Sequence, residues 1–402
     1  MSESGANRAS EGREAAFESL ACPRMDSPFL QAELRALGAD ARLSSQALQL
    51  RERGYLRVEG LLEPELVDAI VAGYDWLFDP RTEFEATPDE LHRLQLDTNR
   101  RQDAWSVFAP VRSLACHEGV LDLLRALYGR EPIPFQTLNF LQGSAQSLHA
   151  DAMHFSSVPA GFLCGVWVAL EDVSPDSGPL RYAPGSHRAS RVQLSDLGRW
   201  ASKQDHDELG PNYGVYERYV AALLAAGEYE LEELVCPKGS VLIWAADLVH
   251  GGAPILDPST TRRSQVTHYY FEDCIYYSPI HSDAALGEYA LREVRDIRSG
   301  ERVPHALNGV ALRERDVGYR DCDLMRLMRE AQHGDVEAPD LLAKLERERA
   351  RQQAHLRTLE ADNEHQRGHI QNLERILRKT HAHTLYRLGS AVKDLFVKPH
   401  KS

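Results

Sequence analysis

Apolar and polar residues follow two different periods along this chain. In the first third, apolar residues recur every three to four positions, which is the period of one face of an α-helix. The clearest example is the series Leu66, Ile70 and Tyr74, which forms one apolar stripe on a polar background. The predicted helices are residues 44–54, 63–78 and 119–128, with a short strand at 55–58.

Further along the chain the pattern changes to short runs rich in β-branched and aromatic residues, separated by glycine and proline turns. The predicted strands are residues 133–142, 162–173, 239–245 and 264–271. Several short strands with such turns favour a barrel or jelly roll over a doubly wound sheet. Residues 191–233 form a long insertion with a helical stretch at 216–226, which we expect to be a lid at the open end of the barrel.

Residues 338–379 carry a seven-residue apolar repeat. One position of the heptad holds Leu342, Arg349, Leu356, Asn363, Ile370 and Leu377, and the other holds Leu345, Gln352, Leu359, Gln366 and Leu373, so four polar residues interrupt the apolar repeat. A strict period of seven is typical of helices that supercoil around each other. We therefore predict a helical coiled coil that joins two copies of the chain, with a single charged helix as the alternative.

The end of the chain, residues 375–402, is basic, with seven lysine and arginine residues against Asp394 alone. Its apolar residues fall at helical spacing, which predicts a basic amphipathic helix. Such a helix binds either an anionic membrane surface or a partner in a complex. The alternative is a short helix that caps the coiled coil.

The expected organisation has five parts. They are a disordered N-terminus (1–25), a mainly β domain with flanking helices (26–300), a connecting segment (301–337), the coiled coil (338–379) and the basic tail (380–402).

Composition excludes several classes of protein. The formal net charge of −14 disfavours nucleic-acid binding, which needs a basic surface. The six cysteines form no Cys-x-x-Cys pair and resemble neither a disulfide framework nor a zinc ribbon. The first twenty residues lack the apolar segment of a secretory signal, and no run of 18 apolar residues occurs. We expect a cytoplasmic protein whose basic tail could attach it to the inner membrane surface.

A candidate metal site begins at His149-Ala150-Asp151. Alternate residues of a strand point to the same face, so His149 and Asp151 can converge on one ion. His250 follows a predicted strand about a hundred residues later and could supply a third ligand. Two imidazoles and one carboxylate are the ligands that hold non-haem Fe(II) and leave coordination positions open.

Two arginines begin the strand that follows His250. The guanidinium group of Arg262 or of Arg263 is placed to bind an anionic cosubstrate, because it pairs bidentately with a carboxylate. Polar residues in the strand before His149 are further candidates, and Gln136 is the one that we expect to contact the cosubstrate.

Four blocks of sequence carry a resemblance to a known family. They are Leu148–Phe155, Gly165–Asp172, Asp176–Leu180 and Pro184–His187. Together they resemble the phytanoyl-CoA dioxygenase family of Fe(II)/2-oxoglutarate oxygenases, over roughly residues 54–271. The resemblance implies a double-stranded β-helix (a jelly-roll or cupin-like core) that binds Fe(II) and 2-oxoglutarate.

Carried over residue by residue, the resemblance assigns His149, Asp151 and His250 as iron ligands. It assigns Arg262 to the distal carboxylate of 2-oxoglutarate and Trp167 to the wall of its pocket. The arginine lies one residue further from His250 than is common in the family, so Arg263 stays an alternative. Gly252 stands where a serine often helps to hold the cosubstrate.

Three further histidines have weaker predictions. If the strand continues past Asp151, His154 lies on the opposite face from His149 and is structural or faces the substrate. His187 closes a Pro-Gly-Ser-His turn and is expected to orient that loop. By strand parity His268 shares a face with Arg262, which suits either the barrel interior or core packing.

The leading hypothesis is a dioxygenase that hydroxylates a small-molecule, lipid-linked or glycan-linked metabolite and converts 2-oxoglutarate and O₂ to succinate and CO₂. Two hypotheses from other classes compete with it. One is a non-catalytic β-helix scaffold that dimerises through its coiled coil. The other is an isomerase or hydrolase that holds Zn²⁺ or Mn²⁺ with the same ligands. The sequence names neither the substrate nor the oxidised carbon.

Overall fold

The computed structural model describes residues 20–97, 99–189, 191–199, 201, 210–284, 288–312 and 322–323. The predicted coiled coil (338–379) and basic tail (380–402) lie outside the described residues. So do residues 1–19 of the expected N-terminal segment and most of 313–337 in the connecting segment.

The N-terminal elements begin with two helices, α2 (Leu30–Ala36) and α3 (Ala41–Arg53). The side chain of Asp40 caps α3 by accepting a hydrogen bond from the Leu43 amide at 2.7 Å. Gly54 ends the helix in the left-handed conformation (φ 78°), which glycine adopts without strain. Strand β1 (Tyr55–Val58) follows at once, so this predicted helix and strand are confirmed.

The predicted helix 63–78 is in fact two helices, α4 (Pro64–Ala72) and α5 (Tyr74–Phe78), which meet at Gly73. The ring of Phe108 packs directly against this glycine, and a Cβ atom there would lie 2.2 Å from Phe108 Cζ. A contact from a distant part of the chain therefore requires glycine at the junction of the two helices, which helical periodicity does not reveal. The helix predicted over 119–128 is confirmed as α8 (Glu118–Tyr128).

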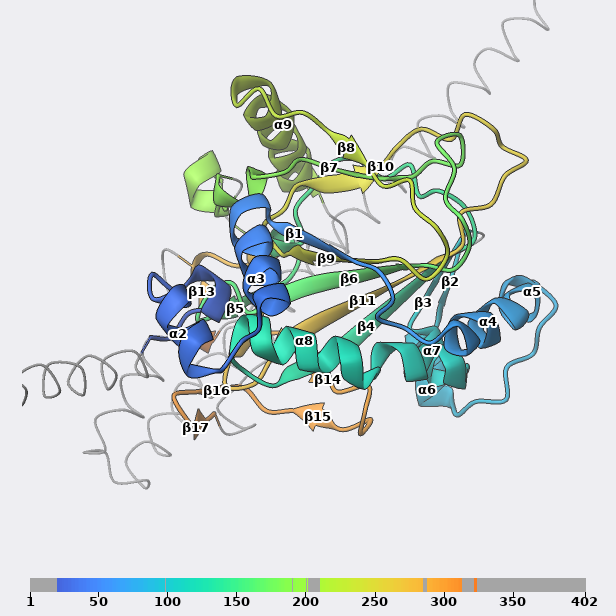
Figure 1. Ribbon diagram of the computed structural model, residues 1–402, viewed down its shortest axis with the longest axis horizontal. Coiled ribbons are helices and arrows are strands. Elements are labelled where there is room, and N and C mark those ends of the chain that lie inside the picture. Colours follow the sequence, from blue (N-terminus) through green and yellow to red (C-terminus); the bar gives the residue numbers. More distant parts are fainter. Residues whose placement is uncertain are drawn as a thin grey trace, which may run out of the picture. The chain divides into compact units, whose positions relative to one another are not determined.

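A seven-stranded antiparallel sheet is the centre of the fold (Figure 1). In spatial order its strands are β1, β9 (Val241–Ala245), β6 (Leu163–Ala169), β11 (Ser264–Phe271), β4 (Pro132–Phe140), β3 (Arg100–Gln102) and β2 (Gln95–Leu96). Every residue of β6 and β11 is buried, because both faces of the sheet are covered.

Helices cover one face of this sheet and a smaller sheet lies on the other side (Figure 1). The smaller sheet consists of β10 (His250–Gly252), β7 (Leu180–Tyr182) and β8 (Glu232–Glu233). A first core packs between the large sheet and helices α3, α4, α7 (Ala109–Ala115) and α8. A second core packs between the two sheets and includes Trp167, Tyr182, Leu242 and Val266. The predicted mainly β core with flanking helices is thus confirmed.

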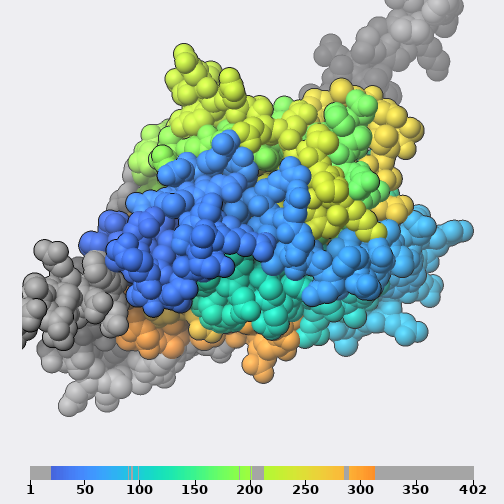
Figure 2. Space-filling model, in the orientation of Figure 1, coloured from blue at the N-terminus to red at the C-terminus, as the bar shows by residue number. Residues whose placement is uncertain are grey.

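The helix predicted at 216–226 begins earlier, as α9 (Gly210–Ala226), on the side of the smaller sheet (Figure 1). In the space-filling view the N-terminal helices, α8 and the region of α9 cover most of the strands from this side (Figure 2).

The remaining elements are short. They are η1 (Arg24–Asp26), α6 (Pro88–Arg93), η2 (Ala104–Ser106), η3 (Asp151–Met153), β5 (Ser156–Val158), η4 (Ser186–Arg188), η5 (Leu194–Leu197), β12 (Ile275–Tyr277), η6 (Pro279–His281), β13 (Glu288–Tyr289), β14 (Val294–Arg295), β15 (Arg302–Val303), β16 (Ala306–Leu307), β17 (Val310–Ala311) and β18 (Cys322–Asp323).

Candidate metal centre and active site

The two histidines of the predicted triad lie side by side on paired backbone. His149 and His250 form an isolated antiparallel bridge, with amide-to-carbonyl distances of 2.9 and 2.8 Å in the two directions. Their ring centroids are 4.6 Å apart. Backbone pairing therefore brings together two residues that are a hundred positions apart in the sequence.

Each histidine has one ring nitrogen fixed by a backbone carbonyl. His149 Nδ1 lies 2.8 Å from the carbonyl oxygen of Ser147, and His250 Nδ1 lies 2.9 Å from that of Leu248. A carbonyl oxygen only accepts, so both Nδ1 atoms carry the proton and both Nε2 atoms keep a lone pair, which in His149 lies 3.3 Å from the side-chain amide nitrogen of Gln146. The Nε2 atoms are the ones that face Asp151.

Asp151 comes from a turn and not from a strand, so the prediction of a continuous strand through His149 and Asp151 is wrong. Ala150 is extended (φ −112°, ψ 136°), and Asp151 then begins the 3₁₀ turn η3. One extended residue is enough to keep residues i and i+2 on the same side. The turn also brings His154 back toward the site, with its ring 6.0 Å from that of His149, so the face expected of a continuing strand does not apply.

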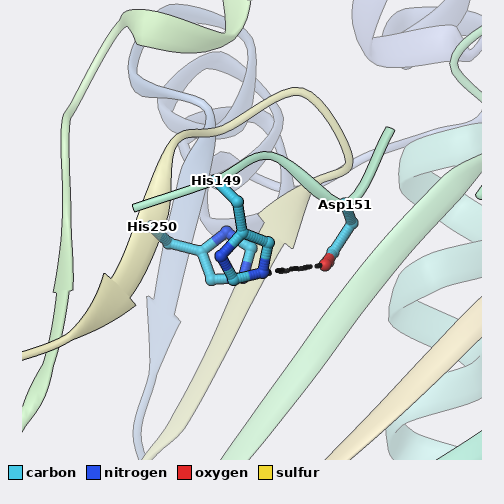
Figure 3. Close-up of side chains that lie close together, drawn as sticks. All are labelled: His149, Asp151 and His250. Carbon is cyan, nitrogen blue, oxygen red and sulfur yellow. Dashed lines mark ion pairs between the residues drawn. The ribbon is translucent and has the colours of Figure 1, made fainter. Parts of the chain in front are cut away.

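The three side chains converge in a buried position (Figure 3). Asp151 Oδ1 lies 3.8 Å from Nε2 of His149 and 3.8 Å from Nε2 of His250. One ligand atom from each residue falls within 4.8 Å of the others. In the part of the chain that the structure describes, these are the residues that could hold a metal ion as a group.

The ionisation states suit a metal ion. Burial and the neighbouring His250 lower the pKa of His149 to about 4, so this imidazole is neutral at pH 7. Burial by itself would raise the pKa of Asp151, but the surrounding imidazoles of His250, His268 and His149 outweigh it and hold that pKa well below its usual range. A neutral imidazole and an ionised carboxylate are the forms that bind metals, so the donor set fits Fe(II).

Two groups hold the other oxygen of the Asp151 carboxylate. Trp244 Nε1 donates a hydrogen bond to Asp151 Oδ2 at 2.7 Å, and His268 Nε2 lies 3.3 Å from the same oxygen. This leaves Oδ1 directed at the two ligand imidazoles. His268 therefore belongs to the site, which strand parity left undecided, whereas Trp244 was not predicted because its role depends on contact across strands.

Arg262 is the arginine that points into the site. It is buried, and its guanidinium carbon lies 5.7 Å from the ring of Phe140 and 5.8 Å from the ring of Trp167. Burial lowers the pKa of Arg262 to about 10, so it stays a cation at neutral pH. Among the described residues no acidic side chain pairs with it, and its Nε has no hydrogen-bond partner. A buried cation in this state needs an anion from outside the chain.

Arg263 points away from the site. Its guanidinium group lies 3.6 Å from Asp75 and 4.0 Å from Glu171, and its amide donates to Glu171 at 2.6 Å. These partners neutralise its charge, so Arg262 and not Arg263 is free for a cosubstrate.

A cavity of about 240 Å³ joins the triad to Arg262. Both Trp167 and Gln136 line it, and their contact with a cosubstrate stays a prediction. Gly252 has no side chain to make the contact that a serine often makes in the family, and a Cβ atom there would lie 2.6 Å from the Ala145 amide nitrogen. His187 lies outside the cavity and bonds to the Arg51 carbonyl at 3.0 Å, which is the structural role predicted for it.

The predicted insertion lies against the site. Tyr213 of α9 lines the cavity, and the hydroxyl of Tyr216 accepts a hydrogen bond from the Ala150 amide at 2.8 Å. The insertion thus supports the turn between His149 and Asp151. Movement of this segment as a lid stays a prediction.

The sequence profile described as phytanoyl-CoA dioxygenase (PhyH) matches residues 50–264, more than half of the chain. The chain belongs to this family. The resemblance carried by its sequence motifs is thereby confirmed.

The curated relatives have low sequence identity to this chain, and the match covers only part of each protein. Phytanoyl-CoA dioxygenase domain-containing protein 1 from Danio rerio is 27% identical, with 36% of this chain and 66% of the relative covered. The Bos taurus protein of the same name is 26% identical, with 36% and 65% covered. The chain thus spans slightly under two thirds of the length of these relatives.

Two similar solved structures are the non-heme alpha ketoglutarate dependent carbocyclase SnoK and the protein EctD from S. alaskensis. SnoK has 17% identity and a TM-score of 0.43, with 60% of this chain and 88% of SnoK covered. EctD, solved with 2-oxoglutarate and 5-hydroxyectoine, has 19% identity and a TM-score of 0.42, with 58% and 76% covered. These likenesses are too distant to bear on a substrate.

Among the described residues, no helix has both the length and the apolar character needed to cross a membrane.

Proposed function

We propose that the protein is an Fe(II)- and 2-oxoglutarate-dependent dioxygenase with a double-stranded β-helix core. Its substrate would be a small-molecule, lipid-linked or glycan-linked metabolite that it hydroxylates. The observation that carries this proposal is one cavity lined both by a buried His-Asp-His triad and by the buried Arg262, which has no acidic partner among the described residues. This pairing suits a cosubstrate with one carboxylate for the metal and one for the arginine.

His149, Asp151 and His250 would hold the iron, and 2-oxoglutarate would extend from the metal to Arg262. When bound, iron and cosubstrate activate O₂ for the attack on an inert C–H bond, with 2-oxoglutarate and O₂ converted to succinate and CO₂.

The protein itself would orient the groups that hold the metal and match the charge of the cosubstrate. The carbonyls of Ser147 and Leu248 fix the tautomers of the two imidazoles. Trp244 and His268 hold Asp151 through Oδ2, which favours binding of the metal through Oδ1 alone and leaves coordination positions open. Arg262 matches the charge of the distal carboxylate, and the burial of Trp167 beside it keeps water from that pair.

A non-catalytic scaffold does not need these features. A scaffold gains nothing from a buried arginine that lacks an acidic partner, and a Zn²⁺ hydrolase needs no cation for a second carboxylate. The homodimer through 338–379 and the membrane or partner contact through 375–402 stay predictions of the sequence.

The test is turnover of 2-oxoglutarate by the full chain loaded with Fe(II). We expect succinate to form in the presence of O₂, because these oxygenases consume some cosubstrate without their substrate. Asp151→Ala should abolish it by removing a ligand, while Asp172→Ala, which removes an exposed carboxylate outside the cavity, should retain it. Equal succinate formation by wild type and Asp151→Ala would contradict the proposal.

A further inference from the structure

The edge strand β3 adds a second arginine to the wall of the cavity. Arg100 pairs with Phe140 of β4, and Gln102 pairs with Leu138. Paired residues of neighbouring strands share a face, so Arg100 and Gln102 lie on the cavity side with Phe140 and Leu138. The residue between them, Arg101, points to the opposite face, where it donates to backbone carbonyls of α5.

Among the residues that the structure describes, Arg100 has no counter-charge. Its side chain is half-buried and lines the cavity, and within the described part of the chain its guanidinium group makes no hydrogen bond or ion pair. Arg101 differs, because its guanidinium donates to the Leu77 and Phe78 carbonyls. The unpaired state thus distinguishes Arg100 from the arginine next to it.

The charges of the proposed complex balance without Arg100. The two charges of Fe(II) and the charge of Arg262 are matched by Asp151 and the two carboxylates of 2-oxoglutarate. A substrate that closes the cavity removes water from Arg100, which is costly unless an anion replaces that water.

We propose that the substrate of this site carries an anionic group, a carboxylate or a phosphate, that Arg100 binds. This inference rests on the proposed function, since it concerns the substrate of the same cavity. Arginine suits either group, because its planar fork donates two parallel hydrogen bonds to adjacent oxygens.

The register also gives the separation along β4 between the position of Arg100 and that of His268. His268, beside Asp151, pairs with Gln136 of β4, and Arg100 pairs with Phe140 four residues further along the same strand. At about 3.3 Å per residue this separation is on the order of 10 Å. The anionic group would therefore lie well away from the carbon that is oxidised.

Aromatic rings form the wall near the metal. His154 and Tyr213 have ring centroids 5.3 Å apart, and Phe155 lies 5.4 Å from His268. All four rings line the cavity. This end suits an apolar or ring-shaped part of the substrate, so a suitable probe has a ring at one end and an acid at the other.

The test uses three probes with the same apolar part: 4-phenylbutyrate, 4-phenylbutyl phosphate and the neutral 4-phenylbutyramide. Their affinities are measured by calorimetry under argon with the full chain loaded with Fe(II) and 2-oxoglutarate. We expect at least one anion to bind tenfold or more tightly than the amide. Arg100→Gln should reduce this preference to less than twofold, and Arg100→Lys should restore part of it.

The matched control is Arg57→Gln, which makes the same change in the same sheet. Arg57 is exposed, pairs with Glu59 at 2.7 Å and does not line the cavity, so the preference should persist. The relative affinity of the carboxylate and the phosphate identifies which acid the site prefers.

Three results would overturn the inference. They are equal binding of acid and amide by the wild type, no binding of any probe, and an Arg100→Gln variant that weakens 2-oxoglutarate tenfold while keeping the preference. The last would assign Arg100 to the cosubstrate. Failure of the proposed function is distinguished beforehand, because wild-type protein would then show no 2-oxoglutarate binding at all.

Discussion

At the scale of single residues, the site depends on the Asp151 carboxylate, whose two oxygens have different contacts. Asp151 Oδ1 faces the ligand imidazoles, while Oδ2 accepts a hydrogen bond from Trp244. Groups that hold a metal ligand in place commonly contribute tenfold or more to metal affinity.

Trp244→Phe tests this arrangement, because it keeps an aromatic ring and removes only the Nε1–H donor. We expect Fe(II) affinity, measured by anaerobic equilibrium titration, to fall about 10- to 100-fold. Trp167→Phe is the control, since Trp167 Nε1 has no hydrogen-bond partner, and its Fe(II) affinity should stay within twofold of wild type. An unchanged affinity in Trp244→Phe would show that the hydrogen bond does not position the ligand.

The two adjacent arginines give a second prediction at this scale. Arg262→Gln should raise the KM for 2-oxoglutarate about 100-fold, or about 3 kcal/mol, because a buried carboxylate would lose its charged partner. Arg263→Gln makes the same change one residue away, and its KM should stay within about threefold because Arg263 pairs with Glu171. A larger effect at Arg263 than at Arg262 would reverse the assignment.

At the scale of elements, strand pairing sets the position of Trp244. Gly165 of β6 pairs with Trp244 of β9, and the indole ring lies over the glycine. A Cβ atom at Gly165 would lie 2.3 Å from Trp244 Cε2. Only glycine leaves room for the ring that holds Asp151.

Gly165→Ala should therefore displace the indole. We expect the free energy of unfolding to fall by about 1–3 kcal/mol, as is usual for overpacking, and Fe(II) affinity to fall with it. Gly214→Ala in α9 is the control, because a Cβ atom there meets only the Arg218 side chain at 3.8 Å. It should leave both quantities unchanged or slightly raise stability. Wild-type stability and Fe(II) affinity in Gly165→Ala would mean that the sheet adjusts without moving Trp244.

The elements also show what sequence reveals and what it does not. His149, Asp151 and His250 could be proposed as a group because the chemistry needs those residue types and because the surrounding sequence blocks resemble the family. The need for glycine at position 73, between α4 and α5, was not predictable, because it depends on the distant ring of Phe108. Trp244 likewise depends on cross-strand register, which no local pattern specifies.

At the scale of the whole molecule, a buried histidine far along the chain makes stability depend on pH. His305 is buried and its Nδ1 accepts a hydrogen bond from the Tyr276 amide at 3.1 Å. Burial and the nearby Arg302 lower the pKa of His305 to about 4. An imidazole that accepts through Nδ1 and lies among packed side chains resists protonation.

Acidification should therefore destabilise the protein through this residue. Below pH 6.5 the unfolded chain takes up a proton at His305, whereas the folded protein does so only near pH 4. Between these values the free energy of unfolding falls as pH falls, by up to about 3 kcal/mol. In urea unfolding of metal-free protein, His305→Gln should remove this part of the slope. The same slope in variant and wild type would exclude His305 as its source.

Also at this scale, the two-sheet core was predictable from short strands and turns, whereas the position of α9 was not. Its helix was predicted from local pattern, but its place beside the metal depends on the contact between Tyr216 and Ala150. Residues from several elements of the domain therefore line the cavity. Arg100 is one of them because β3 extends the large sheet beside β4.

The most direct test of the central claim is anaerobic titration of the Fe(II)-loaded protein with 2-oxoglutarate, followed by visible absorption. The account predicts a weak metal-to-ligand charge-transfer band that saturates in wild type and is absent in Asp151→Ala. The absence of that band in wild-type protein with one bound iron would contradict the claim that this cavity binds 2-oxoglutarate at the metal.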